Sequence, residues 1–273
     1  MSSSPAISSR SAHGKFTPSS AATVIAIALI AYAADDTVHE VLGHGAACLI
    51  FKINMLRISS VGLQTAESSR AVAAAGALAN VFAGVASLLL AARQRRFSPW
   101  SYFIWLFGFI NLMNGTGYLM ASALLGSGDW SVVIAGLNPP LAWRAGMGLL
   151  GVILFAFSVR WAASIMTEKV CQGFVDHADL SRLTVLAYLA GGILFVAASV
   201  FNPYSPGLIL ASGAGASFGL TFGLLLVPDM VKNVRAGDSL PANALELNWG
   251  WVVFAVLVAG IFIGVFGRGV ALS

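Results

Sequence analysis

Long apolar segments alternate with short polar ones along almost the whole chain after residue 19. A membrane-spanning helix needs about 20 predominantly apolar residues. Segments of about this length or longer occur at residues 20–51, 71–92, 100–125, 141–166, 183–201, 206–227 and 249–270. The first is longer than one straight crossing needs, so we expect it to be kinked or to form two pieces. The pattern predicts an all-α polytopic membrane protein with about six or seven transmembrane helices.

Two segments depart from this pattern. Residues 1–19 are rich in serine and contain no acidic residue, which is typical of a disordered tail. The stretch "KINMLRISSVGLQT", within residues 52–66, is polar and partly β-branched, and it predicts a short β-like hairpin between the first two spans. The chain therefore divides into a tail (1–19), a membrane core (20–130) and additional transmembrane helices of unknown role (131–273).

Composition and charge agree with a membrane location. The chain is 58% hydrophobic and only 10% charged, whereas soluble domains carry about 25% charged residues. Its formal charge of +4 is too small for a nucleic-acid surface. If seven spans cross with the N-terminus inside, ten of the fifteen lysines and arginines lie on the inner side, including the "RQRR" run. The positive-inside rule then predicts a cytoplasmic N-terminus in a plasma or inner membrane.

Ionisable residues gather in the first span, in the sequence "DDTVHEVLGHGAA" (residues 35–47). Such groups are costly inside a membrane and mark functional sites. Neutral imidazoles are common zinc ligands, and a glutamate beside one can act as a general base. We therefore predict a Zn²⁺ site with His39 and His44 as ligands and Glu40 as the catalytic base.

The spacing of the two histidines requires a distorted helix. The usual H-E-x-x-H motif separates its histidines by about 40° around a helix, whereas the five-residue spacing here separates them by about 140°. A π-bulge would return both to one face, and Gly43 would ease it. The alternative is a regular helix that aligns Asp36, Glu40, His44 and Cys48, which would make Glu40 a ligand and Asp36 an alternative one.

These motifs resemble two known zinc peptidase families. "HEVLGH" is similar to the H-E-x-x-G-H motif of the dipeptidyl peptidase III family. Over about residues 30–125, the layout resembles the site-2 protease-like intramembrane zinc metalloproteases. Their zinc helix is followed by a β-like segment, a span with A-G-P-x-x-N, and a span with N-x-x-P and then L-D-G. The corresponding stretches here are "AAGALANVFAG" with Asn80 and "FINLMNGTGY" with Asn111 and Asn114. The resemblance implies a protease in which these asparagines contact the oxyanion or the substrate.

The chain differs from that pattern at the third metal ligand. Leu78 replaces the proline, and the aspartate of L-D-G is absent. Asp129 is the only acidic residue between Glu67 and Glu168, and the predicted topology places it on the same outer side as the histidines. Asp129 is therefore the preferred third ligand. The remaining candidates are Asp36, Asn114 and Asp35.

The predicted function is hydrolysis of peptide bonds in membrane-associated proteins or peptides. Zinc would lower the pKa of a bound water towards about 7. Glu40 would take a proton as this water attacks the carbonyl, and would then pass it to the leaving amine. One alternative is a metal-dependent hydrolase of lipid amides or esters, and another is a non-catalytic degenerate protease or transporter. An extended edge at 52–66 favours a peptide substrate.

Overall fold

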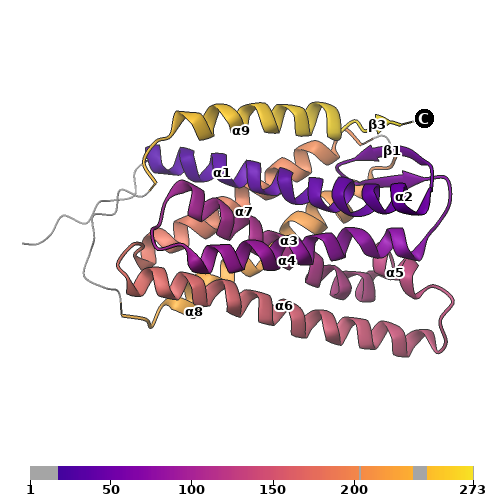
Figure 1. The fold of residues 1–273 in the computed structure, drawn as a ribbon, viewed down its shortest axis with the longest axis horizontal. Helices are drawn as coiled ribbons and strands as arrows, with labels where there is room; N and C mark the ends of the chain where they lie inside the picture. The colour runs from indigo at the N-terminus through magenta and orange to yellow at the C-terminus, as the bar shows by residue number, and fades with distance from the viewer. Residues whose placement is uncertain (1–17, 203, 236–244, 273) are drawn as a thin grey trace, which may run out of the picture.

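The computed structural model describes residues 18–202, 204–235 and 245–272. Long helices lie side by side along one direction, with a small sheet at one end (Figure 1). The helical elements, with η marking the wider π form, are α1 (Pro18–Thr37), η1 (Val38–Gly45), α2 (Ala46–Phe51), α3 (Arg70–Arg93), α4 (Pro99–Leu125), α5 (Asp129–Ile134), α6 (Pro140–Cys171), α7 (His177–Ser199), η2 (Ile209–Leu220), α8 (Gly223–Val231), α9 (Trp249–Ile261) and η3 (Phe262–Phe266). The strands are β1 (Met55–Ser59), β2 (Gly62–Thr65) and β3 (Val270–Ala271). Of the predicted tail, residues 1–17 lie outside the described residues, and Pro18 already belongs to α1.

The prediction of an all-α polytopic protein is confirmed. In the described chain, six helices are long and apolar enough to cross a membrane: Ser20–Phe51, Arg70–Arg93, Pro140–Cys171, His177–Ser199, Ser212–Val231 and Trp249–Phe266. The first is one continuous helix of 32 residues and not two pieces. The helix α4 has 27 residues and is also long enough, at about 40 Å. Its asparagines and glycines make it less apolar than the six.

The helix α4 forms the centre of the bundle and packs against α1, α3 and α6. Its large aromatic side chains, including Trp105 and Phe109, are buried. The indole N–H of Trp105 donates to the carbonyl of Ala162 at 3.0 Å, and the hydroxyl of Tyr102 donates to that of Leu183 at 2.9 Å. Buried aromatic groups with polar tips need such partners. These bonds tie α4 to α6 and α7.

The outer faces of the bundle are apolar. On α6, Leu149, Ile153 and Phe157 follow one another at four-residue spacing and are exposed. On α9, Val253 and Leu257 do the same. Long exposed apolar faces of this kind are stable against lipid and not against water. The protein is therefore a multi-pass membrane protein.

The predicted hairpin at residues 52–66 is present as the antiparallel pair β1 and β2. A third strand was not predicted, because the last apolar segment was expected to continue as a span to residue 270. Instead the helix ends at η3, Gly269 adopts a positive φ of 75°, and β3 pairs with β1. The strand order is β2-β1-β3. This sheet and α5 lie at the end of the bundle opposite to the start of α1 (Figure 1).

Two predicted boundaries are wrong. The spans predicted at 141–166 and 183–201 leave residues 167–182 as a polar loop. In the structure, α6 continues to Cys171 and α7 begins at His177, with Asp176 accepting a hydrogen bond from the backbone N–H of Asp179 at 2.6 Å. The sixth span lies at Ser212–Val231 and not at 206–227, and it consists of the end of η2 followed by α8. The C-terminal helices pack directly on the first half, α6 against α4 and α7 against α1.

Candidate metal centre

The two histidines lie on a π-helical segment within the first span. Residues Val38–Gly45 form η1, an eight-residue π-helix. A π-helix bonds residues five apart, so His39 and His44 return to the same face. The predicted bulge is confirmed, and the regular-helix alternative is wrong. Cys48, which that alternative aligned with the site, packs instead in a small apolar cluster with Ala47 and Val72.

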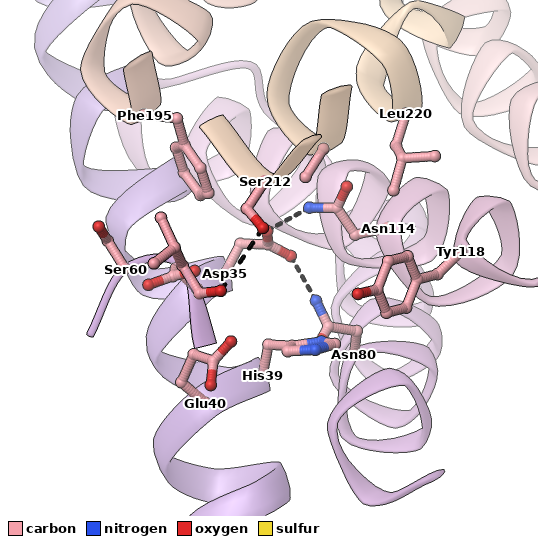
Figure 2. Close-up of a pocket in the computed structure, with 13 residues that line it drawn as sticks. Asp35, His39, Glu40, Ser60, Asn80, Asn114, Tyr118, Phe195, Ser212 and Leu220 are labelled. Carbon is pink, nitrogen blue, oxygen red and sulfur yellow. Dashed lines mark hydrogen bonds between the residues drawn. The ribbon is translucent and has the colours of Figure 1, made fainter. Parts of the chain in front are cut away.

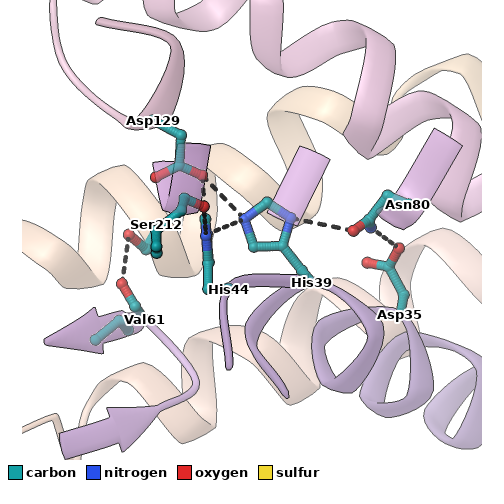
Figure 3. A network of polar contacts seen from close by, with 8 residues as sticks. Asp35, His39, His44, Val61, Asn80, Asp129 and Ser212 are labelled. Atoms are coloured by element: carbon teal, nitrogen blue, oxygen red, sulfur yellow. Dashed lines mark hydrogen bonds and ion pairs between the residues drawn. The ribbon is translucent and has the colours of Figure 1, made fainter. Parts of the chain in front are cut away.

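Three side chains converge at this face, as the sequence predicted. The Nε2 atoms of His39 and His44 lie 3.1 Å apart, and each lies 3.1 Å from Oδ2 of Asp129 (Figure 3). Three ligands of a tetrahedral zinc ion with bonds of about 2.0–2.1 Å would be about 3.3 Å apart. In the described chain, these three residues form a group that can hold a metal ion.

The other nitrogen of each imidazole is already bonded. His44 donates its Nδ1–H to the backbone carbonyl of Val72 at 2.7 Å, and His39 donates its Nδ1–H to Oδ1 of Asn80 at 3.1 Å. A neutral imidazole protonated at Nδ1 presents a lone pair at Nε2. Two lone pairs and a carboxylate oxygen therefore meet at 3.1 Å, a contact that needs a proton or a cation between the atoms. Hydrogen bonds of this kind orient metal-binding histidines.

A further set of bonds fixes the orientation of Asn80. Its Nδ2 donates to Oδ1 of Asp35 at 2.7 Å, so its oxygen faces His39. The amide of Asn114 donates to the other oxygen of Asp35. Asp35 and Asn80 are buried. Asp35 thus acts through Asn80 on the tautomer of His39 and does not touch the centre.

Two glycines allow α3 to approach the histidines closely. A Cβ at Gly76 would lie 2.5 Å from Nε2 of His44 and 2.7 Å from Nε2 of His39. A Cβ at Gly43 would lie 2.5 Å from the Cα of Gly76. Gly43 is therefore required by the contact between η1 and α3, a reason that the sequence did not reveal.

Asp129 reaches the histidines because the chain turns back after α4. Gly126 and Gly128 adopt positive φ angles of 68° and 85°, and Asp129 is the first residue of α5. The guanidinium of Arg70 donates to the carbonyl of Ala135 and fastens the end of α5 to α3. Burial raises the pKa of the Asp129 carboxyl, but its hydrogen bonds to the histidines lower it more, so this pKa lies below its usual range.

Glu40 and Tyr118 lie beside the three ligands. Glu40 is buried, its Oε2 has no hydrogen-bond partner within the described residues, and it lines a pocket next to His39 (Figure 2). The ring of Tyr118 packs edge-on against His39 with centroids 5.7 Å apart, and its hydroxyl bonds to the backbone of Asp129. A carboxylate oxygen without a hydrogen-bond partner, beside a candidate metal site, is available for proton transfer.

The three predicted asparagines have different environments. Asn80 orients His39, and Asn114 lines the pocket and bonds to Asp35. Asn111 donates to the carbonyl of Phe107 on its own helix and does not line the pocket.

Sequence reasoning missed several residues of the site. The pocket is also lined by Tyr118, Ser60, Phe195, Ser212 and Leu220. Some belong to the hairpin and others to α7 and η2, so the C-terminal half contributes a wall of the pocket. No local motif marks these residues, because they come from segments distant in the sequence.

Comparisons with known proteins add no assignment: no protein-family model, no curated protein and no solved structure matches this chain.

Proposed function

We propose that this protein is an intramembrane zinc metalloprotease that hydrolyses peptide bonds of membrane-associated substrates. One observation carries the proposal. Two imidazole nitrogens and one carboxylate oxygen converge at 3.1 Å, beside a buried glutamate whose Oε2 has no hydrogen-bond partner among the described residues. Two histidines and one carboxylate, with a fourth position left for water or substrate, form a typical catalytic zinc set.

Zinc is the ion of this proposal, because two imidazoles and one carboxylate form a common catalytic zinc set, although the same donors also suit iron(II). The ion would supply Lewis-acid activation of water and of the substrate carbonyl. His39, His44 and Asp129 would hold it, and the bonds to Val72 and Asn80 keep both imidazoles in the binding tautomer.

The remaining chemistry is assigned to groups of the chain. Glu40 accepts a proton from the attacking water and passes it to the leaving amine. The O–H of Tyr118 is the candidate donor to the developing oxyanion, since this side chain lines the pocket next to His39. Asn80 is less suited to that role, because both ends of its amide are bonded to His39 and Asp35.

A peptide substrate is supported by the small sheet next to the site. In the order β2-β1-β3, the strand β2 lies at an edge, and the turn that joins it to β1 lines the pocket at Ser60 and Val61. An extended peptide can add to such an edge and place a carbonyl near the metal. A lipid substrate is the second candidate, favoured by the apolar part of the pocket wall at Phe195 and Leu220.

The test combines metal content with cleavage. Wild type, Glu40→Gln, Asp129→Ala and the control Asp229→Ala are purified in detergent, supplied with zinc and analysed for bound metal. Asp229 is exposed and pairs only with Lys232 on its own helix turn. We expect zinc in wild type, Glu40→Gln and the control, and its loss in Asp129→Ala.

Activity is then measured in proteoliposomes that contain a mixture of membrane proteins, by mass spectrometry of new N-termini. Cleavage by wild type and not by zinc-loaded Glu40→Gln is expected. Release of fatty acids or amines from lipid that depends on Glu40 would favour the lipid hydrolase. A zinc-loaded wild type without any Glu40-dependent product would contradict the enzyme proposal and favour a binding or transport protein.

A further inference from the structure

A pocket next to the metal centre carries more acidic groups than zinc hydrolysis requires. It has a volume of about 80 Å³, and Glu40 and His39 line it together with Asp35 and Asp36 (Figure 2). The mechanism above uses Glu40 as the base, and Asp35 as the partner of Asn80. Asp36 takes no part in the proton transfer or in the orientation of Asn80.

Four oxygen atoms that belong to lining residues of this pocket have no hydrogen-bond partner within the described residues. They are Oδ2 of Asp36, Oε2 of Glu40, Oγ of Ser60 and Oδ1 of Asn114. Ser60, on the turn between β1 and β2, is only 4% exposed, and Asp36 is 7% exposed. Buried polar atoms are normally bonded, so unpaired acceptors from three separate segments indicate a ligand that brings hydrogen-bond donors.

The charge of the pocket indicates the type of donor. Three carboxyl groups line it, and no lysine or arginine does. A metal ion fits this pocket poorly. Within the described residues, the ligand atoms of three histidine, cysteine or acidic side chains come together only at His39, His44 and Asp129. A primary ammonium group carries a positive charge and three N–H donors that point in different directions. It matches a pocket whose carboxyl groups lie on the first helix and whose other unpaired acceptors, Ser60 and Asn114, come from two further walls.

We propose that this pocket binds a primary ammonium group of the substrate, held mainly by Asp36 and Ser60, close to the bond that is cleaved. The inference rests on the proposed function, because it uses the metal centre to define the cleaved bond. The apolar wall formed by Phe195, Ala216 and Leu220 would cover the carbon atoms attached to the ammonium group. The group can come from the N-terminal residue of a substrate or from a lysine side chain.

Metal-binding hydroxamates with the same four-carbon side-chain skeleton test the proposal on the zinc-loaded full chain. The probes share a hydroxamate and an unbranched four-carbon side chain: Nα-acetyl-norleucine hydroxamate without ammonium, norleucine hydroxamate with an α-ammonium group, and Nα-acetyl-lysine hydroxamate with an ε-ammonium group. Dissociation constants are measured by calorimetry in detergent. We expect one ammonium probe to bind about tenfold more tightly or better than the neutral probe, the gain typical of charge-assisted hydrogen bonds. The α-probe would indicate an N-terminal residue, and the ε-probe a lysine.

Variants assign the effect to the pocket. Asp36→Asn keeps the shape of the side chain and removes its charge, and Ser60→Ala removes the unpaired hydroxyl. Each is expected to abolish most of the preference for the ammonium probe, whereas the exposed control Asp229→Asn is expected to keep it. Thermal unfolding of each variant shows that it is folded. Equal binding of all three probes, or an unchanged preference in both folded pocket variants, would overturn the proposal.

A second measurement separates this inference from the proposed function. If no hydroxamate binds, the metal centre has failed as a catalytic site, and n-butylammonium alone is titrated into wild type and Asp36→Asn. Binding that depends on Asp36 would still support an ammonium pocket. No binding of n-butylammonium to wild type would overturn the pocket as well.

Discussion

Two clusters of buried polar groups lie next to each other at one end of the bundle, and they differ in how their atoms are bonded. In the metal centre, each imidazole of His39 and His44 has its Nδ1–H bonded to a carbonyl, so only the three converging atoms remain for a ligand. In the neighbouring pocket, single oxygens of Asp36 and Ser60 have no partner within the described residues.

The difference shows how the two clusters would act. A ligand set must be held rigidly, because metal binding requires the donor atoms at defined distances. A recognition pocket can leave acceptors unpaired, because the ligand supplies the donors and then satisfies them. Variants of groups that hold the metal centre should therefore change zinc affinity strongly, and variants outside it should change zinc affinity little.

The largest effect is expected for Gly76→Ala. The new Cβ would lie within 2.7 Å of Nε2 of both histidines, so the imidazoles must move out of the metal position although all three ligands remain. We expect zinc affinity to fall by about 100-fold or more, measured by competition with a chelator. The control is Gly146→Ala on α6, where a Cβ meets nothing within 4 Å. Normal zinc binding by Gly76→Ala would disprove the close approach of α3.

A smaller effect is expected for Asn80→Leu, which keeps the size of the side chain but removes the acceptor for His39. Loss of such an orienting group lowers metal affinity by roughly 10- to 100-fold. Asn111→Leu is the matched control, because Asn111 is also buried in a long helix, and its amide donates to the carbonyl of Phe107 on the same helix. Zinc titration of both variants checks the difference. An equal loss of zinc affinity in both variants would mean that Asn80 acts through packing alone.

A still smaller effect is expected for Tyr118→Phe. The ring contact with His39 remains, and only the hydroxyl bond to the backbone of Asp129 is lost. One such bond contributes about 1 kcal/mol, so zinc affinity should fall roughly two- to tenfold. The control is Tyr188→Phe, whose hydroxyl donates to the carbonyl of Phe218 away from the centre. If the control loses as much zinc affinity, the hydroxyl of Tyr118 does not support Asp129.

The smallest effect is expected for Cys48→Ala. A regular helix would make Cys48 a neighbour of the site, but in the structure it packs with Ala47 and Val72. Zinc content should be unchanged, and unfolding should become easier by at most about 1 kcal/mol because little volume is removed. Metal analysis and thermal unfolding measure the two quantities. A loss of bound zinc in a folded Cys48→Ala protein would favour the regular-helix arrangement.

Most of the helical architecture could be predicted from the sequence, because the length of an apolar segment and the loop charges are local properties. The π-helical segment was also predictable, since five-residue spacing places His39 and His44 on one face only if the helix is widened. The end of the last helix was not predictable from the sequence. Whether residues 270 and 271 continue it or pair with β1 depends on a partner strand more than 200 residues earlier.

The same distinction applies to the candidate site. The sequence by itself determined the pair of histidines and the adjacent glutamate, because they lie within six residues of one helix. It indicated Asp129 only through the absence of other acidic residues nearby. Tertiary structure decided that Asp129, 90 residues from His39, reaches the centre, that Asn80 orients an imidazole, and that Ser60 and Asp36 line the same pocket. Such contacts depend on how separate helices pack, and helix packing is set by the whole bundle and not by local sequence.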